Sequence, residues 1–127
     1  YIKDISILLV EDNDFNIMVA QDELHAVIEN LKLDIAKNGK IAIEKLQSVK
    51  FDLVLMDLQM PEMNGFDATK AIRKLNGKIA EIPIIAMTAN TLESEIEKCL
   101  ECGMNDFISK PFDSKILLEK INKLIKA

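Results

Sequence analysis

The sequence has no long apolar run and no opening segment typical of secretion. Its apolar stretches fall far short of the roughly 20 residues that a membrane-spanning helix needs. The first residues do not resemble a signal peptide, and the chain begins with Tyr1 in place of Met, which is compatible with a piece of a longer protein. These absences predict a cytoplasmic domain that makes no membrane contact of its own.

The sequence also lacks an excess of positive charge. It has 16 Lys and Arg against 21 Asp and Glu, a formal net charge of -5, and its basic residues are spread along the chain. A nucleic-acid-binding domain usually carries a basic patch or stripe. We therefore expect this domain to contact no nucleic acid.

Cysteine is scarce, and the two that occur, Cys99 and Cys102, form a C-x-x-C. A redox pair of this spacing needs its first Cys at a helix N-terminus, where the positive end of the helix dipole stabilises thiolate. Here the pair lies late in a predicted helix, just before Gly103, which indicates a helix end. A zinc site would need more ligands, and His25 is the only histidine. We interpret both cysteines as reduced thiols.

The rest of the composition is that of one globular domain. Apolar residues make up 49% of the chain and charged residues 29%. A length of 127 residues allows a real core and leaves little room for a second folded unit. We therefore expect a single domain over residues 1–127.

The spacing of apolar residues predicts five strands that alternate with five helices. Short apolar runs predict strands over residues 5–10, 33–36, 52–56, 82–87 and 106–109. Helical spacing predicts helices over residues 14–30, 40–48, 66–75 and 92–102, and Asp113 is a candidate N-cap for the last helix. Pro61, Asn64 and Gly65 indicate a loop before the third helix.

Strict alternation of strands and helices is typical of an α/β fold with a parallel sheet covered on both faces. Right-handed crossovers favour a doubly wound sheet, since 127 residues are too few to close an eightfold barrel. With strand order 2-1-3-4-5, the first strand lies beside the third and the fifth lies at an edge. Such sheets bind ligands beyond the carboxyl ends of their strands.

Polar residues occupy those carboxyl ends. Glu11 and Asp12 follow the first predicted strand, and Asp57 follows the third. Thr88 follows the fourth strand, and Lys110 follows the fifth. Taken singly, each is more often a polar loop end or a helix cap. Because four strands deliver this set to one edge of the sheet, the set predicts a functional site.

The chemistry of these residues indicates phosphoryl transfer. Three crowded carboxylates repel one another unless a cation neutralises them, and Mg²⁺ prefers carboxylate, carbonyl and water oxygens. Asp57 is the natural nucleophile and would form an aspartyl phosphate. Lys110 supplies a positive charge and Thr88 a hydroxyl donor for the phosphoryl oxygens.

Four segments of the sequence resemble the receiver domains of bacterial-type response regulators. They are VEDN at 10–13, MDLQMPEMNG at 56–65, MTA at 87–89 and SKP at 109–111. The resemblance covers essentially the whole chain. The residues at 58–61, 87–90 and 99–106 are most similar to those in receivers of hybrid sensor histidine kinases. The resemblance to receiver domains implies a flavodoxin-like fold, with strand order 2-1-3-4-5 and five helices.

The resemblance implies a role for each matching position. The implied phosphoacceptor is Asp57, and the groups that contact the phosphoryl oxygens are Thr88 and Lys110. The implied metal ligands are Glu11 (through a bound water), Asp12, Asp57 and the backbone carbonyl of Gln59. The implied switch residues are Thr88 and Phe107, and the residues implied to tune hydrolysis are Gln59 and Asn90. Glu11 and Phe107 depart mildly from the family, which often has Asp and Tyr there.

The implied function is phosphorelay signal transduction in a two-component system. Asp57 would take a phosphoryl group from the phosphohistidine of a histidine kinase or a histidine phosphotransfer domain, and a conformational switch would control output. The implied cofactor is Mg²⁺, with Mn²⁺ as an alternative ion. Such a domain is no conventional enzyme, although it promotes its own phosphorylation and dephosphorylation. A weak homodimer and tethering to a membrane sensor within a longer protein are also compatible with the resemblance.

Two further interpretations of the acidic residues start from other families. An EF-hand calcium loop matches at positions one, three, five and twelve, which are Asp12, Asp14, Asn16 and Glu23. Ile17 stands where that loop needs Gly, which argues against calcium. A haloacid-dehalogenase-type phosphatase also attacks through an Asp after a strand. It uses a second Asp two residues on, where this chain has Gln59.

Two last alternatives concern the role of a receiver itself. A degenerate receiver would only bind a partner, and the intact set of acids, hydroxyl and lysine disfavours that interpretation. His25 could be mistaken for a phosphate donor, since histidines donate phosphate in these pathways. It follows Leu24 in a predicted helix, so we expect a surface or partly packed side chain.

Overall fold

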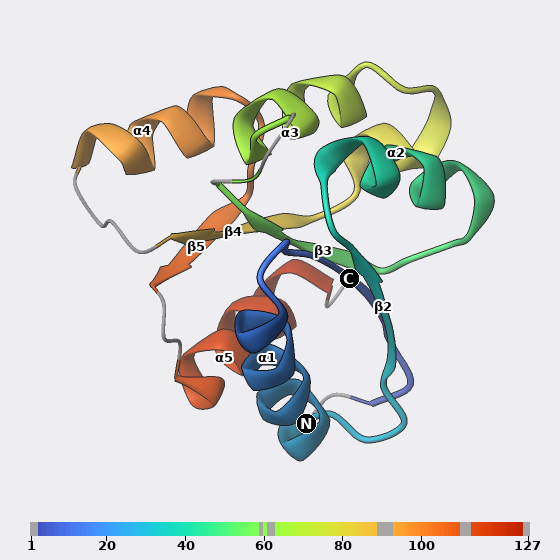
Figure 1. Ribbon diagram of the computed structural model, residues 1–127, viewed down its shortest axis with the longest axis vertical. Helices are drawn as coiled ribbons and strands as arrows, with labels where there is room; N and C mark the ends of the chain where they lie inside the picture. Colours follow the sequence, from blue (N-terminus) through green and yellow to red (C-terminus); the bar gives the residue numbers. More distant parts are fainter. Residues whose placement is uncertain (1–2, 59, 61–62, 89–92, 110–112, 126–127) are drawn as a thin grey trace.

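A parallel sheet of five strands, in the order β2-β1-β3-β4-β5, forms the middle layer of the computed structural model (Figure 1). The structure describes residues 3–58, 60, 63–88, 93–109 and 113–125. Its strands are β1 (Ser6–Val10), β2 (Lys32–Ala36), β3 (Leu53–Asp57), β4 (Ile84–Thr88) and β5 (Asp106–Ser109). The predicted doubly wound fold and strand order are confirmed.

Helices cover both faces of the sheet (Figure 1). The helices on one face are α1 (Asp14–Val27) and α5 (Ser114–Ile125). Those on the other face are α2 (Gly39–Ser48), α3 (Gly65–Arg73) and α4 (Glu93–Glu101). A short 3-10 helix, η1 (Gly77–Glu81), precedes β4. In the part of the chain that the structure describes, no helix combines the length and apolarity that crossing a membrane requires.

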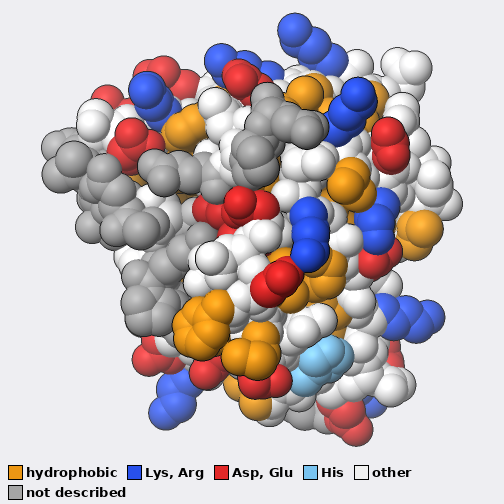
Figure 2. All heavy atoms as spheres, viewed as in Figure 1, with side chains coloured by type: hydrophobic (Ala, Val, Ile, Leu, Met, Phe, Trp, Pro, Cys, Tyr) orange, Lys and Arg blue, Asp and Glu red, His pale blue; other side chains and the backbone are white. Residues whose placement is uncertain are grey.

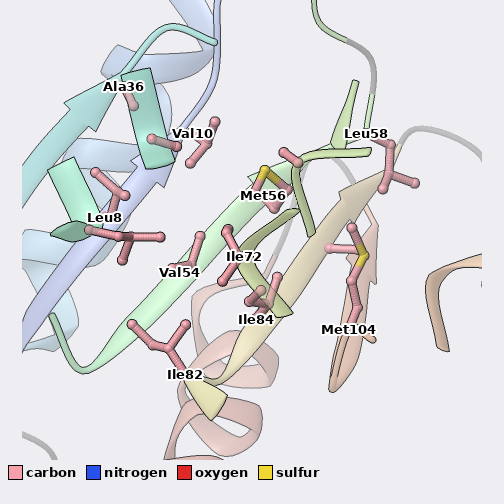
Figure 3. Packing of buried hydrophobic residues seen from close by; sticks show 14 of the residues in the cluster. Leu8, Val10, Ala36, Val54, Met56, Leu58, Ile72, Ile82, Ile84 and Met104 are labelled. Carbon is pink, nitrogen blue, oxygen red and sulfur yellow. The ribbon is translucent and has the colours of Figure 1, made fainter. Parts of the chain in front are cut away.

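The strand side chains alternate between two cores, one under each helical layer. Figure 3 shows Val54, Met56 and Ile84 packed with Ile72 of α3 in the first core. The second core joins the opposite faces of the same strands to α1 and α5, and its fully buried members include Leu9, Leu24, Leu55, Ile85 and Ile121. Because both faces are covered, β3 and β4 are buried throughout, which explains their continuous apolar sequences.

Asparagine side chains begin three of the helices, directly after the carboxyl ends of β1 and β2 and in the loop that follows β3. The Oδ1 atom of Asn13 accepts the Asn16 N–H at 3.0 Å, and Asn38 and Asn64 cap α2 and α3 in the same way. Asp113 precedes α5, and its Oδ1 accepts the Lys115 N–H at 2.8 Å, as predicted for an N-cap. These caps satisfy backbone N–H groups in the first turn of each helix.

Several predicted boundaries shift for local reasons. The first helix ends at Val27 and not at 30, because Ile28 is extended with a φ of -118° and buries its side chain. The fourth strand begins at Ile84 in place of residue 82, after Pro83, which has no N–H to pair. The 3-10 helix η1 was not predicted at all.

Arg73 joins three segments at the amino ends of β4 and β5. Its guanidinium donates four hydrogen bonds of 2.8 to 2.9 Å. Three go to the backbone carbonyl oxygens of Ala80, Ile82 and Gly103, and the fourth goes to Asn105 Oδ1. Asn105 Oδ1 also accepts the Ile84 N–H at 2.9 Å. The end of α3, η1 and the turn before β5 are therefore fixed together, at the opposite end of the strands from Asp57.

The buried hydroxyl of Thr69, on α3, lowers the stability of the folded protein. Its side chain is fully buried, and its Oγ1 has no hydrogen-bond partner among the described residues. We expect Thr69→Val, which replaces the hydroxyl with a methyl group of similar size, to raise the free energy of unfolding by about 1 kcal/mol. Urea denaturation of both proteins measures the difference.

Thr69→Ser is the matched control, because it keeps the hydroxyl and removes the methyl group. It should lower stability by opening a small void in the core. A loss of stability in Thr69→Val would contradict the assignment and reveal a hydrogen bond to the hydroxyl.

Candidate functional site

Three carboxylates meet beyond the carboxyl ends of β1 and β3. Glu11 and Asp12 directly follow β1, and Asp57 is the last residue of β3. The two strands are neighbours in register, with Val10 opposite Met56, so the next positions come together. One oxygen from each of the three side chains lies within 4.8 Å of the others. The structure therefore brings together the three acids predicted to form the site.

The three acids differ in how far they are exposed to solvent. Glu11 is 2% exposed and Asp57 is 5% exposed, whereas Asp12 faces solvent. Glu11 Oε2 accepts the backbone N–H groups of Asp12 at 3.1 Å and Asn13 at 3.3 Å, next to the N-terminus of α1. Backbone donors and the positive end of a helix dipole both stabilise a carboxylate. Glu11 is thus held in place by the turn that starts α1.

The backbone of Asp57 lies directly against the start of α3. A Cβ atom added at Gly65 would be 2.4 Å from the carbonyl oxygen of Asp57, and the Gly65 N–H donates to Leu58 O at 3.0 Å. Gly65 was expected in a loop but is the first residue of α3. Its need for glycine comes from this close approach, which no local sequence signal reveals.

The two predicted switch positions lie on β4, which neighbours β3, and on β5, which neighbours β4. Thr88 ends β4 and is 5% exposed, one residue beyond Met87, which is opposite Asp57. Phe107 is half-buried on β5, opposite Ala86. Thr88, two residues after Ala86, is on the same face of the sheet as Phe107 because side chains alternate along a strand. The structure therefore places the two switch residues on neighbouring strands.

Three of the predicted site residues fall outside the described part of the chain. They are Gln59, Asn90 and Lys110. Their implied roles in metal binding, hydrolysis and contact with the phosphoryl group stay predictions.

The chemistry of the carboxylate cluster suits a divalent cation. Three acids with oxygens within 4.8 Å of one another place negative charge where mutual repulsion is strong. All three offer hard oxygen donors, which Mg²⁺ and similar ions prefer over nitrogen or sulfur. The cluster fits the predicted metal.

The structure excludes one alternative interpretation of the sequence and shows the predicted surface position of His25. The calcium loop is wrong, because α1 begins at Asp14 and includes Asn16 and Glu23, where an EF-hand needs an irregular loop. His25 is exposed on α1, and the only histidine side chain is visible on the surface in Figure 2. A group of acidic side chains lies near the middle of the same view.

The sequence matches the model of a known protein family. The model of the response regulator receiver domain matches residues 7–122, nearly the whole chain. The chain belongs to this family and is a receiver domain of two-component phosphorelay signalling, as the resemblance implied.

The relatives within the family include hybrid histidine kinases. Hybrid signal transduction histidine kinase B of Dictyostelium discoideum is 42% identical over 92% of this chain. The match covers 6% of that kinase, so the chain spans only a small part of such a relative's length. The likeness is to a receiver segment within a much longer polypeptide.

Two solved receiver structures share the fold closely. The receiver domain of the sensor histidine kinase PA1611 from Pseudomonas aeruginosa, with a magnesium ion coordinated in its active site cleft, is 34% identical with a TM-score of 0.87. That match covers 97% of this chain and 98% of the other. The Saccharomyces cerevisiae Ssk1 receiver domain, solved with the phosphotransfer protein Ypd1, is 29% identical with a TM-score of 0.87, covering 99% and 92%.

The C-x-x-C pair lies away from the carboxylate cluster, at the end of α4. Both cysteines are buried, and the Cys102 thiol donates to the carbonyl oxygen of Cys99 at 3.2 Å. Burial raises the pKa of the Cys99 thiol to about 11, and it also raises the pKa of Cys102. A reactive or metal-binding cysteine needs the opposite shift. The structure agrees with inert, reduced thiols.

We expect both thiols to resist alkylation in the folded protein. At pH 8 a thiol of pKa about 11 holds more than about a hundredfold less thiolate than an ordinary cysteine, and burial blocks access as well. Iodoacetamide labelling followed by mass spectrometry measures this, with the protein unfolded in guanidinium chloride as the control. Equal labelling rates in the folded and unfolded protein would contradict burial of the pair.

Proposed function

We propose that this receiver domain accepts a phosphoryl group on Asp57 and that Glu11, Asp12 and Asp57 bind the divalent metal that the reaction needs. The observation that carries the proposal is the meeting of these three carboxylates within 4.8 Å at the ends of β1 and β3. By resemblance, the backbone carbonyl of Gln59 is a further ligand. Mg²⁺ is the proposed ion, with Mn²⁺ as an alternative.

We expect the side chain of Asp57 to act as the nucleophile. One of its carboxylate oxygens attacks phosphorus, the bond from phosphorus to the donor's ring nitrogen breaks, and the electron pair returns to the donor imidazole. When bound, the metal offsets negative charge on the phosphoryl oxygens. The Thr88 hydroxyl and, by resemblance, the Lys110 ammonium would stabilise those oxygens as well.

The proposed donor is a phosphohistidine on a histidine kinase or a histidine phosphotransfer domain. The Ssk1 receiver, which shares this fold, was solved with such a phosphotransfer protein, Ypd1. The magnesium ion of the PA1611 receiver supports the metal in the same way. The chain would promote its own phosphorylation and dephosphorylation without being a conventional enzyme. The cytoplasmic location, the weak homodimer and the single domain over 1–127 stay predictions.

Asp57→Asn tests the acceptor. With acetyl phosphate and Mg²⁺, the parent should gain the mass of one phosphoryl group, and the variant should gain none, because an amide is no nucleophile here. Intact-mass spectrometry measures the adduct, and excess chelator should abolish it in the parent.

Asp52→Asn is the matched control, because Asp52 lies one residue before β3 at its other end, where its Oδ2 accepts the Ser6 N–H at 2.8 Å. It should be labelled like the parent. A stable adduct on Asp57→Asn, or full labelling of the parent in chelator, would exclude the proposed site.

Asp12→Ala tests the metal ligands separately from phosphorylation. In the parent, Mg²⁺ should raise the melting temperature, by an amount that corresponds to about 2.7 kcal/mol at one hundred times Kd. The variant should lose most of this response. Without metal, its stability should stay level or rise, because one like charge is removed from the cluster.

Asp14→Ala removes a charge of the same sign two residues away, from an exposed side chain paired with Lys37. It should keep the Mg²⁺ response. Thermal unfolding followed by circular dichroism measures all three proteins. An equal Mg²⁺ response in Asp12→Ala and Asp14→Ala would show that the ion binds elsewhere.

A further inference from the structure

A lysine of α5 reaches the aromatic ring on the edge strand. Lys120 Nζ lies 5.0 Å from the centre of the Phe107 ring and 3.0 Å from Asp106 Oδ1. The contact is shielded in part, since the side chains of Lys120 and Asp106 are 23% and 26% exposed. A lysine ammonium within about 6 Å of a ring centre is attracted to the ring face.

One carboxylate oxygen sets the geometry of this contact. Asp106 Oδ1 accepts the backbone N–H of Phe107 at 2.8 Å as well as the Lys120 ammonium. The ammonium is therefore tied to the same backbone that carries the ring. Two buried residues of α5, Leu117 at 1% and Ile121 at 0% exposure, anchor the helix from which Lys120 extends.

The position of β5 shows what the contact restrains. β5 is the edge strand of the sheet, between α4 on one side and α5 on the other (Figure 1). Phe107 packs from this edge against the core on the α4 side, opposite the small side chain of Ala86. Thr88 is on the same face, one pair further along. A ring that turned from the edge toward Thr88 would leave the Lys120 ammonium behind.

We propose that Lys120 is a positioning residue for the Phe107 ring, which it holds in the half-exposed position by a cation–π contact that Asp106 aligns. The ring turns toward Thr88 only when this contact breaks, so Lys120 sets the resting balance of the switch. The link to phosphorylation rests on the proposed function. The contact in the unphosphorylated protein does not.

The expected size of the effect follows from the strength of such contacts. Partly shielded cation–π contacts favour one arrangement over its alternative by about twofold to thirtyfold. A ligand that binds only the switched state gains apparent affinity in proportion to the population of that state. Removing the contact should therefore tighten the binding of a phosphoryl mimic by about twofold to thirtyfold.

The first experiment observes the ring without any phosphoryl group. In protein with ¹³C-labelled phenylalanine rings, Phe107→Leu identifies the Phe107 signals. Lys120→Met, which keeps the aliphatic stem and removes the charge, should move these signals in the metal-free protein. Lys120→Arg should largely restore them, since guanidinium also binds ring faces. Unmoved Phe107 signals in Lys120→Met would overturn the proposal, whatever the fate of Asp57.

The second experiment measures affinity for fluoroberyllate in Mg²⁺ by titration. Lys120→Met should bind this anion about twofold to thirtyfold more tightly than the parent. Loss of a positive charge alone would weaken anion binding, so the two explanations predict opposite signs. Lys123→Met, at an exposed position of the same helix, is the charge-matched control and should bind like the parent or slightly more weakly.

The double variant completes the cycle. In a Phe107→Leu background there is no ring to hold, so Lys120→Met should no longer change the affinity. Equal tightening with and without the ring would overturn the proposal, because Lys120 would then act by another route. If the parent fails to bind fluoroberyllate, the proposed function of Asp57 fails, and the ring signals still decide the role of Lys120.

Discussion

Mutual repulsion among three carboxylates is the constraint to which the rest of this structure responds. Glu11, Asp12 and Asp57 are held together by a buried parallel sheet, not by attraction for one another. The two hydrophobic cores stabilise the fold and offset the repulsion among the carboxylates. The backbone N–H groups at the start of α1 hold the Glu11 carboxylate in place. A site strained in this way favours ligands that carry positive charge, or bring it with them.

The opposite end of the sheet is held by hydrogen bonds and carries no such charge cluster among the described residues. The carboxyl ends of the strands carry charges and loops, whereas the amino ends of β4 and β5 are joined by the four hydrogen bonds of Arg73. One end of the sheet is fixed and the other is available for chemistry. The edge strand β5 carries Phe107, whose ring is in contact with Lys120 of α5.

The fold and the acidic site were predictable because they depend on patterns that repeat along the chain. Buried strands of a parallel sheet are continuously apolar, and a polar residue after each one is conspicuous, as with Asp57 after residues 53–56. Contacts made across the fold by single side chains leave no such pattern. Arg73 and Lys120 each look like ordinary surface cations of a helix, and only the three-dimensional arrangement shows what they bind. The end of α1 was also missed, because Ile28 leaves the helix in an extended conformation and buries its side chain in the core.

The close approach of Gly65 to Asp57 has a mechanical meaning. With a hypothetical Cβ only 2.4 Å from the Asp57 carbonyl oxygen, the first turn of α3 packs directly against the main chain at the end of β3. Any residue larger than glycine at position 65 would have to push α3 and the end of β3 apart. The packing of α3 on the sheet and the position of the Asp57 carboxylate therefore depend on one missing side chain.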